Sequence, residues 1–276
     1  MNIKYINSKG IEINLSEFPY ILKPDNLFDY GWDFDAVDFV DGGKIKKFKK
    51  GLQTKSLELY ICASTRAEFN ANLRNFFDIV GADIANLSPG KLMLDTEEYI
   101  LGYIYASEKA LSPTGLSTMV NGFSFACESP FWTKDVTYSF YPGSTSPSSD
   151  GADYLYDYLF DYTAGNDVEI INSDSVMGSD FLMNIWGAVD TPSISIGANV
   201  YIVNTVLYTG EFLQVDSRKK TIVRYKNNGE QVNEFESRDM SSEFFKKIQP
   251  GLNVIETNCA FDLTMYQKRS EPLWNF

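Results

Sequence analysis

The chain has 276 residues, of which 44% are hydrophobic and 15% aromatic, and its formal net charge is -13. This length predicts about two domains, and this apolar content suffices to bury real cores, which excludes wholesale disorder. The negative charge argues against a protein that grips nucleic-acid phosphates over a broad surface, but it allows nucleic acid to slide past without binding. The sequence has no apolar run of about 18 residues and no basic-then-apolar N-terminal segment, so we expect neither a membrane span nor export.

The complete absence of histidine excludes several classes of chemistry. It removes nucleophile arrangements that depend on a histidine base, and the usual zinc ligand sets that include imidazole. The three cysteines, Cys62, Cys127 and Cys259, are far apart and lie in apolar contexts, which indicates buried free thiols. We therefore expect no enzyme, no cofactor and no metal, although the absence of histidine does not exclude catalysis that uses only carboxylates.

The first part of the chain predicts a β-rich unit. Alternating apolar and polar residues indicate two short strands on either side of a turn at residues 8–10. Further strands are predicted at residues 57–62, 91–94, 99–105 and 119–128.

One helix is predicted near residues 65–81. Thr65 and Glu68 have the spacing of a capping box, and Gly81 is typical of a helix C-terminus. Apolar residues then recur at helical spacing and form one stripe that should pack on a sheet, namely Phe69, Leu73, Phe76, Phe77, Val80 and Ile84.

An acidic stretch and a basic stretch follow each other between the first strands and this helix. Residues 25–41 interleave aromatic rings with six aspartates, which are Asp25, Asp29, Asp33, Asp35, Asp38 and Asp41. A calcium loop starting at Asp33 would need an oxygen ligand at its fifth position and glycine at its sixth, but Val37 and Asp38 stand there. The simpler interpretation is a strand or loop with solvated carboxylates and buried rings.

Residues 44–50 contain five lysines in seven positions, which are Lys44, Lys46, Lys47, Lys49 and Lys50. One interpretation is a charged edge strand that resists edge-to-edge pairing. Another is a basic finger that meets an acidic surface, such as residues 25–41 of a neighbouring copy. The lysines, together with Asp33, Asp35 and Asp38, are therefore our candidate protein-interface residues. Contact with nucleic acid ranks third, because the rest of the chain is acidic.

The second part of the chain predicts a β-sandwich. Residues 142–151 (PGSTSPSSDG) have the composition of a loop or linker, and residues 154–162 are dense in tyrosines, which pack in cores or form interfaces or sugar platforms. Short strands then recur with turns between them, at residues 169–172, 181–188, 193–196, 200–203, 211–216, 221–226, 252–256 and 261–266. Turns at residues 216–217 and 227–229 make residues 208–233 an antiparallel meander of two or three strands.

We place the domain boundary between residues 137 and 138.

The order of several short motifs resembles that of distal tail proteins of long-tailed bacteriophages and prophages. In residues 138–276 these motifs are PSISI at 192–196, VDS at 215–217, PGLN at 250–253 and RSEPLW at 269–274. In residues 1–137 they are the helix opening near Arg66, GKL at 90–92, Gly102 within the strand at 99–103, and CESPFW at 127–132. The resemblance spans most of the chain. It does not extend to the acidic and lysine-rich stretches of residues 25–50.

The resemblance implies a mainly β structural protein of the virion. The N-terminal domain (1–137) would be a β-barrel or sandwich with one covering helix that closes into a six-membered ring at the tail tip. The C-terminal domain (138–276) would be a galectin-like β-sandwich. The ring would join the tail tube protein to the tail-associated baseplate protein and support receptor-binding proteins, with DNA passing through its channel without specific binding. Assembly would take place in the bacterial host cytoplasm.

Two alternatives from other classes stay open. A carbohydrate-binding β-sandwich would contact host cell-surface glycans, and binding of glycans by residues 138–276 alone would favour it. A glycoside hydrolase needs two carboxylates at the scissile bond, and 37 acidic residues make some suitable pair almost unavoidable. Loss of polysaccharide cleavage with one carboxylate would identify such an enzyme.

Overall fold

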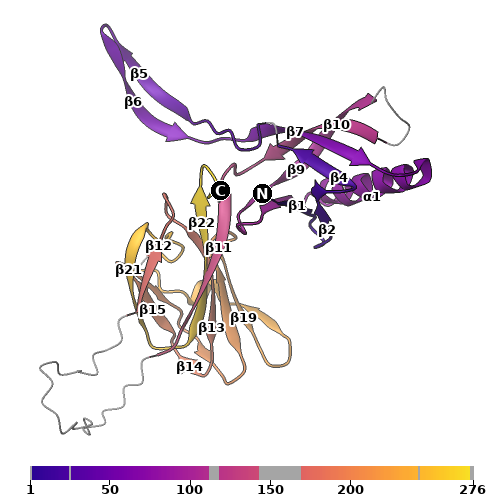
Figure 1. The fold of residues 1–276 in the computed structure, drawn as a ribbon. Coiled ribbons are helices and arrows are strands. Elements are labelled where there is room, and N and C mark those ends of the chain that lie inside the picture. The colour runs from indigo at the N-terminus through magenta and orange to yellow at the C-terminus, as the bar shows by residue number, and fades with distance from the viewer. Residues whose placement is uncertain (1, 25, 112–117, 143–168, 242, 274–276) are drawn as a thin grey trace, which may run out of the picture. The chain divides into compact units, whose positions relative to one another are not determined.

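The computed structural model describes residues 2–24, 26–111, 118–142, 169–241 and 243–273. These residues form two compact units, one of residues 1–134 with 268–276, and the other of residues 135–267. The fold is mainly β, as predicted, and the described residues contain one α-helix (Figure 1). The strands pair antiparallel to each other, as β1 does with β2, β10 with β9 and β13 with β18, and no described helix is long and apolar enough to cross a membrane.

The first unit is built on an antiparallel sheet in the order β2-β1-β8-β9-β10-β7-β4-β3. Its long central strand β9 pairs with β8 through its first residues and with β10 through the rest. The inward residues of these strands alternate with outward ones, as strand geometry requires. The strands are β1 (Ile3–Ile6), β2 (Glu12–Asn14), β3 (Ser16–Glu17), β4 (Tyr20–Lys23), β7 (Gln53–Cys62), β8 (Gly90–Leu94), β9 (Tyr99–Leu111) and β10 (Thr118–Cys127).

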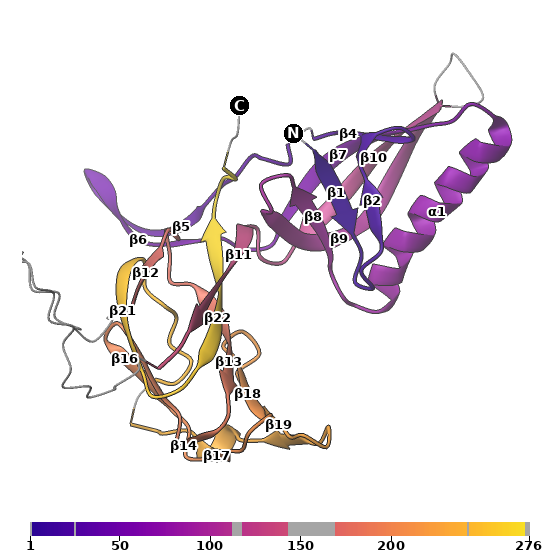
Figure 2. The ribbon, with the colours of Figure 1, turned by 60° about the horizontal axis from the view of Figure 1, so that its bottom comes forward.

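Helix α1 (Arg66–Ala85) lies along this sheet and closes the core of the first unit (Figure 2). The predicted capping box forms, since the Thr65 side chain accepts from the Glu68 backbone and the Glu68 side chain accepts from the Thr65 backbone. Phe69, Phe76 and Val80 are buried as expected. Ile84 is exposed, so the predicted stripe is wrong at its last position.

The predicted end of the helix at Gly81 is also wrong. The helix continues through Gly81 to Ala85, and Asn86 ends it by donating both its backbone N–H and its side-chain amide to the Ala82 carbonyl. The left-handed residue beyond the end is Leu87, with a φ of 48°. A glycine near the end of an apolar stripe is a weak stop signal, because tertiary packing can extend a helix past it.

A buried carboxylate ties the end of the helix to the first strand. Asp83 is fully buried and accepts a hydrogen bond of 2.5 Å from the Tyr5 hydroxyl and one of 2.7 Å from the Ser8 backbone N–H. Gly90 passes so close that a Cβ there would lie 2.3 Å from the Tyr5 hydroxyl oxygen. Burial, followed by the bond to Asp83, raises the pKa of Tyr5 far above its usual range.

The second unit is a sandwich of two antiparallel sheets. One has the order β20-β19-β18-β13-β22-β11, and the other β12-β21-β15-β16. Their inner faces share one core, in which Met183 and Leu263 of the first sheet meet Ile194 and Ile255 of the second. The strands are β11 (Trp132–Phe140), β12 (Glu169–Ser173), β13 (Asp180–Trp186), β15 (Ser193–Ile196), β16 (Asn199–Ile202), β18 (Phe212–Asp216), β19 (Thr221–Tyr225), β20 (Gln231–Asn233), β21 (Gly251–Thr257) and β22 (Phe261–Arg269).

Smaller elements complete this unit. Strands β14 (Val189–Asp190) and β17 (Val206–Leu207) pair with each other, and a 3-10 turn η1 spans Phe235–Ser237. The predicted meander is present as β18, β19 and β20, with Gly229 at a φ of 82° in its second turn.

The last described residues return to the first unit. Strand β22 passes out of the second unit after Gln267, and the Leu273 backbone N–H then donates a hydrogen bond of 2.7 Å to the Glu98 carboxylate. The first unit therefore includes a C-terminal segment that the predicted division at residues 137 and 138 assigned to the second domain. The predicted linker at 142–151, apart from Pro142 at its start, and the tyrosine-rich residues 154–162 lie outside the described residues.

Candidate functional site: the exposed arm of the first unit

The acidic and basic stretches form one antiparallel hairpin, which we call the arm (residues 33–49). It consists of β5 (Asp33–Phe39) and β6 (Gly42–Lys49), which pair only with each other and form a long twisted ribbon (Figure 1). Gly42 has a φ of 125°, a conformation that favours glycine, where the chain turns from one strand to the other. Nearly every residue of the arm is exposed, so the arm contributes nothing to the core of the unit.

One face of the arm is charged. Directly opposite residues of an antiparallel pair lie on the same face, and here Asp33 faces Lys49, Asp35 faces Lys47 and Val37 faces Lys44. Lys49 Nζ forms an ion pair of 2.9 Å with Asp35 Oδ1. The hydrogen bond from Lys49 lowers the pKa of the Asp35 carboxyl, and the same contact raises the pKa of Lys49. Both side chains are exposed to solvent, so this pair adds little stability.

The other face of the arm is apolar and open to solvent. Phe34 faces Phe48 with ring centroids 6.3 Å apart, and Ala36 faces Ile45. A bulge between these two pairs leaves Lys46 without an opposite residue. The exposed fractions of Phe34, Phe48 and Ile45 are 57%, 56% and 48%, and Phe39 and Val40 at the tip are exposed as well. We call Phe34, Ala36, Ile45 and Phe48 the apolar face.

The base of the arm is fixed to the first unit by polar contacts. The Gln53 side chain donates to the Gly31 carbonyl at 2.9 Å, and the Ser56 backbone N–H donates to the Asn26 side chain at 2.6 Å. Lys55 donates to the Asp29 carbonyl. The arm is therefore anchored at its base and free along its length.

Lys50, at the end of the arm, sits in a cage of three aromatic rings. Its Nζ lies 4.4 Å from the ring centroid of Phe131, 5.4 Å from that of Tyr30 and 5.5 Å from that of Trp32. Within the described part of the chain this buried ammonium has no hydrogen-bond partner. Burial is the main cause that lowers the pKa of Lys50 to about 8, and the neighbouring Lys55 lowers it further.

The structure brings together seven of the eight predicted interface residues in the arm. These are Asp33, Asp35, Asp38, Lys44, Lys46, Lys47 and Lys49, while Lys50 lies in the cage at its base. The acidic strand thus pairs with the basic strand of its own chain. Their contact with another protein stays a prediction.

The expectation of buried rings in residues 25–41 is wrong for most of them. Phe28 packs against Trp132 with centroids 5.6 Å apart, but Phe34 and Phe39 are exposed. Sequence reasoning missed the apolar face, although alternation of Phe34 and Ala36 with aspartates and valine was a usable signal.

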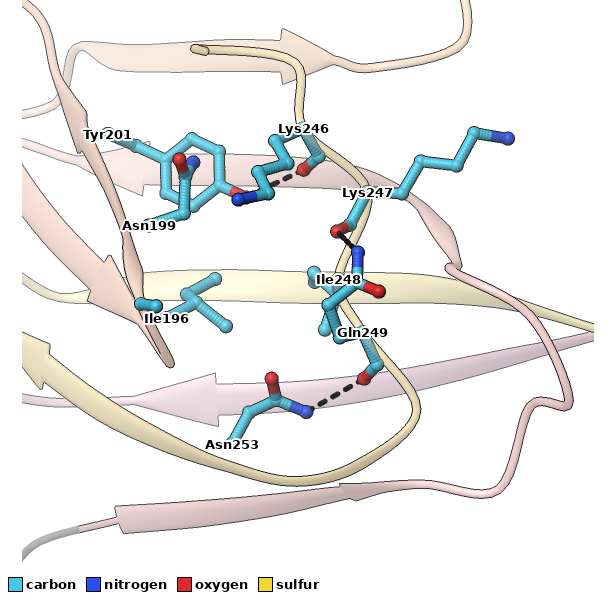
Figure 3. Close-up of a pocket in the computed structure, with 9 residues that line it drawn as sticks. Ile196, Asn199, Tyr201, Lys246, Lys247, Ile248, Gln249 and Asn253 are labelled. Carbon is cyan, nitrogen blue, oxygen red and sulfur yellow. Dashed lines mark hydrogen bonds between the residues drawn. The ribbon is translucent and has the colours of Figure 1, made fainter. Parts of the chain in front are cut away.

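A small pocket in the second unit offers little to a ligand. The Tyr201 hydroxyl donates to the Lys246 carbonyl at 2.8 Å, the Gln249 amide to the Lys247 carbonyl at 2.9 Å, and the Asn253 amide to the Gln249 carbonyl at 2.9 Å (Figure 3). These three polar side chains are thus engaged by backbone carbonyls of one loop. Among the described residues, no group of three or more acidic or cysteine side chains is placed to hold a metal ion.

Comparison with known proteins finds likeness in structure alone. No family model matches the sequence, and no curated protein does. The crystal structure of Dit from phage SPP1, described as a paradigm of the hub adsorption apparatus in phages that infect Gram-positive bacteria, matches with a TM-score of 0.63 at 9% identity. The match covers 97% of this chain and 99% of that chain.

Two structures of the phage P2 baseplate in its activated conformation, with calcium and with strontium, match with TM-scores of 0.65 and 0.64 at 11% and 10% identity. In both, the match covers 98% of this chain and 99% of the other. Over nearly its whole length, this chain has the fold of the phage hub protein Dit and of a phage baseplate protein.

Proposed function

We propose that this chain is a distal tail protein, a structural hub at the tip of a long phage tail, with no catalytic role. The observation that supports this most is the fold, because the likeness to SPP1 Dit extends over 97% of this chain and 99% of the other. A match of both units in one chain is far more specific than a match of either sandwich alone. The second unit would be the galectin-like domain of this hub.

We propose further that six copies close into a ring, and that the arm makes the contact between neighbours. An isolated two-stranded ribbon is marginally stable in water, so a ribbon whose apolar face is exposed needs a cover. In a ring each copy contacts its two neighbours through two different surfaces, because the interface is heterologous. The arm is suited to be one of these two surfaces, because it is anchored at its base and presents apolar and charged residues on opposite faces.

The charge of the chain fits a channel through which DNA moves. A net charge of -13 gives the ring no broad surface that neutralises phosphates. The tail tube protein and the tail-associated baseplate protein would bind the two sides of the ring, and receptor-binding proteins its periphery. The location would be the tip of the virion tail after assembly in the bacterial cytoplasm.

The mass of the purified chain in solution, followed by imaging of any ring, tests this proposal. Reversing the charge of Lys46 and Lys49 (Lys46→Glu with Lys49→Glu) should dissociate the ring, because it removes two cations from the basic strand and breaks the ion pair of Lys49 with Asp35, which weakens attraction to an acidic neighbour. Lys9→Glu with Lys219→Glu changes the net charge equally at exposed sites outside the arm and serves as the control. A strictly monomeric wild-type chain would contradict the ring, and an unchanged oligomer in the arm variant would contradict the role of its lysines.

A further inference from the structure

The outer face of the six-stranded sheet in the second unit holds an exposed tryptophan in a fixed position. Trp186 is the last residue of β13, and 42% of its surface is exposed. Its Nε1–H donates a hydrogen bond of 3.0 Å to Asp262 Oδ2 on the neighbouring strand β22. The other oxygen of Asp262 accepts a hydrogen bond of 2.6 Å from the Ser139 hydroxyl. The Asp262 carboxylate therefore fixes the solvent-exposed indole of Trp186, and Ser139 in turn fixes that carboxylate.

Two further rings brace this indole from the other side. In the register of the sheet, Trp186 lies opposite Phe212 of β18, and Phe212 lies opposite Tyr225 of β19. The Phe212 ring is 5.3 Å from the Trp186 ring and 4.6 Å from the Tyr225 ring, centroid to centroid. Phe212 and Tyr225 are stacked with only 7° between their planes, so they cover each other. The Trp186 ring is tilted by 45° to the Phe212 ring. Of these three rings, Trp186 therefore presents a broad surface to solvent.

Polar groups lie next to the indole on the same face. Asn184 precedes Trp186 by two residues, so both side chains point outward, and Asp262 lies directly opposite Asn184. The Gln214 amide donates to the Asn184 side-chain oxygen at 3.1 Å. Within the described residues this leaves the Asn184 amide hydrogens and the Gln214 carbonyl oxygen free for a ligand. The patch thus offers an apolar ring, an amide donor, an amide acceptor and carboxylate oxygens.

This combination matches the chemistry of a neutral sugar. A pyranose ring has an apolar face of C–H groups that packs on an aromatic ring, and its hydroxyls both donate and accept hydrogen bonds. An anionic ligand would meet the Asp262 carboxylate and a chain of net charge -13. We propose that Trp186, Asn184 and Asp262 form a binding site for a neutral glycan, with Trp186 as the stacking surface. The site lies in the second unit and the arm in the first, so each can be varied without changing residues of the other.

Binding is measured with the full chain by calorimetry against short neutral oligosaccharides of glucose, galactose or N-acetylglucosamine, and against oligogalacturonate as the anionic counterpart. At least one neutral sugar should bind, and Trp186→Leu should weaken its binding by about tenfold or more, as expected for loss of an aromatic anchor. Trp186→Phe keeps a ring and should retain most of the affinity. Leu252→Ala, an exposed apolar residue on the other sheet of the same unit, is the matched control and should change nothing.

Three results would overturn the proposal. One is the absence of binding to every neutral sugar, which would leave the patch as a protein contact or as a packing feature of the sheet. The second is binding of oligogalacturonate alone, and the third is equal binding by Trp186→Leu and wild type. Asn184→Ala, which leaves the aromatic row intact, gives a second variant that should also lose affinity if Trp186→Leu fails to fold. Solution mass of the same samples shows separately whether the ring is present.

Discussion

Lys50 is a single residue through which the stability of the first unit should depend on pH. Burial among the aromatic rings removes water from the ammonium and, together with the nearby Lys55, lowers the pKa of Lys50 to about 8. In the unfolded chain the same group keeps its proton up to its ordinary pKa of 10.5. Between these values the unfolded state binds more protons, so the free energy of unfolding should rise with pH. Its neighbours Lys55, Cys127 and Asp29 also face this region.

Lys50→Met isolates this contribution, because it replaces the ammonium with an apolar group of similar length. Below about pH 8 the variant should be more stable than wild type, since no buried charge remains. As pH rises from about 8 toward 10.5, the stability of wild type should approach that of the variant. Urea midpoints of both proteins over this range give the difference. Burial raises the pKa of Cys127 to about 12, so the thiol of the unfolded chain loses its proton first and the stability of both proteins falls at alkaline pH. A difference that does not vary with pH would contradict the burial of a charged Lys50.

Asp83 is a second residue whose role is structural. Asp83→Ala would leave the buried Tyr5 hydroxyl and the Ser8 backbone N–H without their acceptor. The unsatisfied buried Tyr5 hydroxyl costs about 1–3 kcal/mol and the part-buried Ser8 N–H adds to this, so we expect a loss of about 2–4 kcal/mol in the free energy of unfolding. Asp78→Ala, on the exposed side of the same helix, is the matched control and should change stability little. Denaturant unfolding measures both. Equal effects would show that Asp83 acts only through helix propensity.

At the scale of elements, two glycines of the first unit should respond oppositely to alanine. Gly81 lies inside helix α1, and a Cβ there would meet nothing within 4 Å, so Gly81→Ala should stabilise by about 0.5–1 kcal/mol. Gly102 lies in β9, where a Cβ would come within 2.4 Å of the Ala126 carbonyl oxygen, so Gly102→Ala should destabilise. Thermal unfolding of the two variants beside wild type tests the pair. A destabilised Gly81→Ala would mean that the helix bends or ends there in solution.

Local patterns predicted most strands and the start of the helix. Alternation over residues 57–62 and 261–266 and the Thr65 capping box each act within a few residues, so a short window contains the needed information. The end of the helix was missed because Asn86, which caps it, and the buried Asp83, which is bound by Tyr5 of β1, decide it rather than Gly81. The pairing of strands far apart in sequence, such as β13 with β22, was not predictable from one sequence, since register depends on the whole sheet.

The same limit applies to the candidate site. The charged residues of the arm were found from sequence, because runs of lysine and aspartate are visible without structure. The arrangement of these residues was not predicted. Asp35 lies beside Lys49 and Phe34 is exposed because of the register and the bulge of the hairpin, which a run of charged residues does not reveal. Trp186 gave no sequence signal, because its fixed position comes from Asp262 and Ser139 on two other strands.

At the scale of the whole molecule, the arm should be separable from folding. Asp33 and Lys49 face each other at its base, so residues 34–48 can be replaced by a two-residue Asn-Gly turn that joins them. None of the removed residues belongs to the core of the first unit, so the thermal midpoint should change little. The mass in solution should fall from that of the ring to that of the monomer, because the shortened chain lacks the apolar face that would pack against a neighbouring copy. A shortened chain that still forms the ring would place the contact between copies on the sheet or helix of the first unit, and would leave the arm to bind another tail protein.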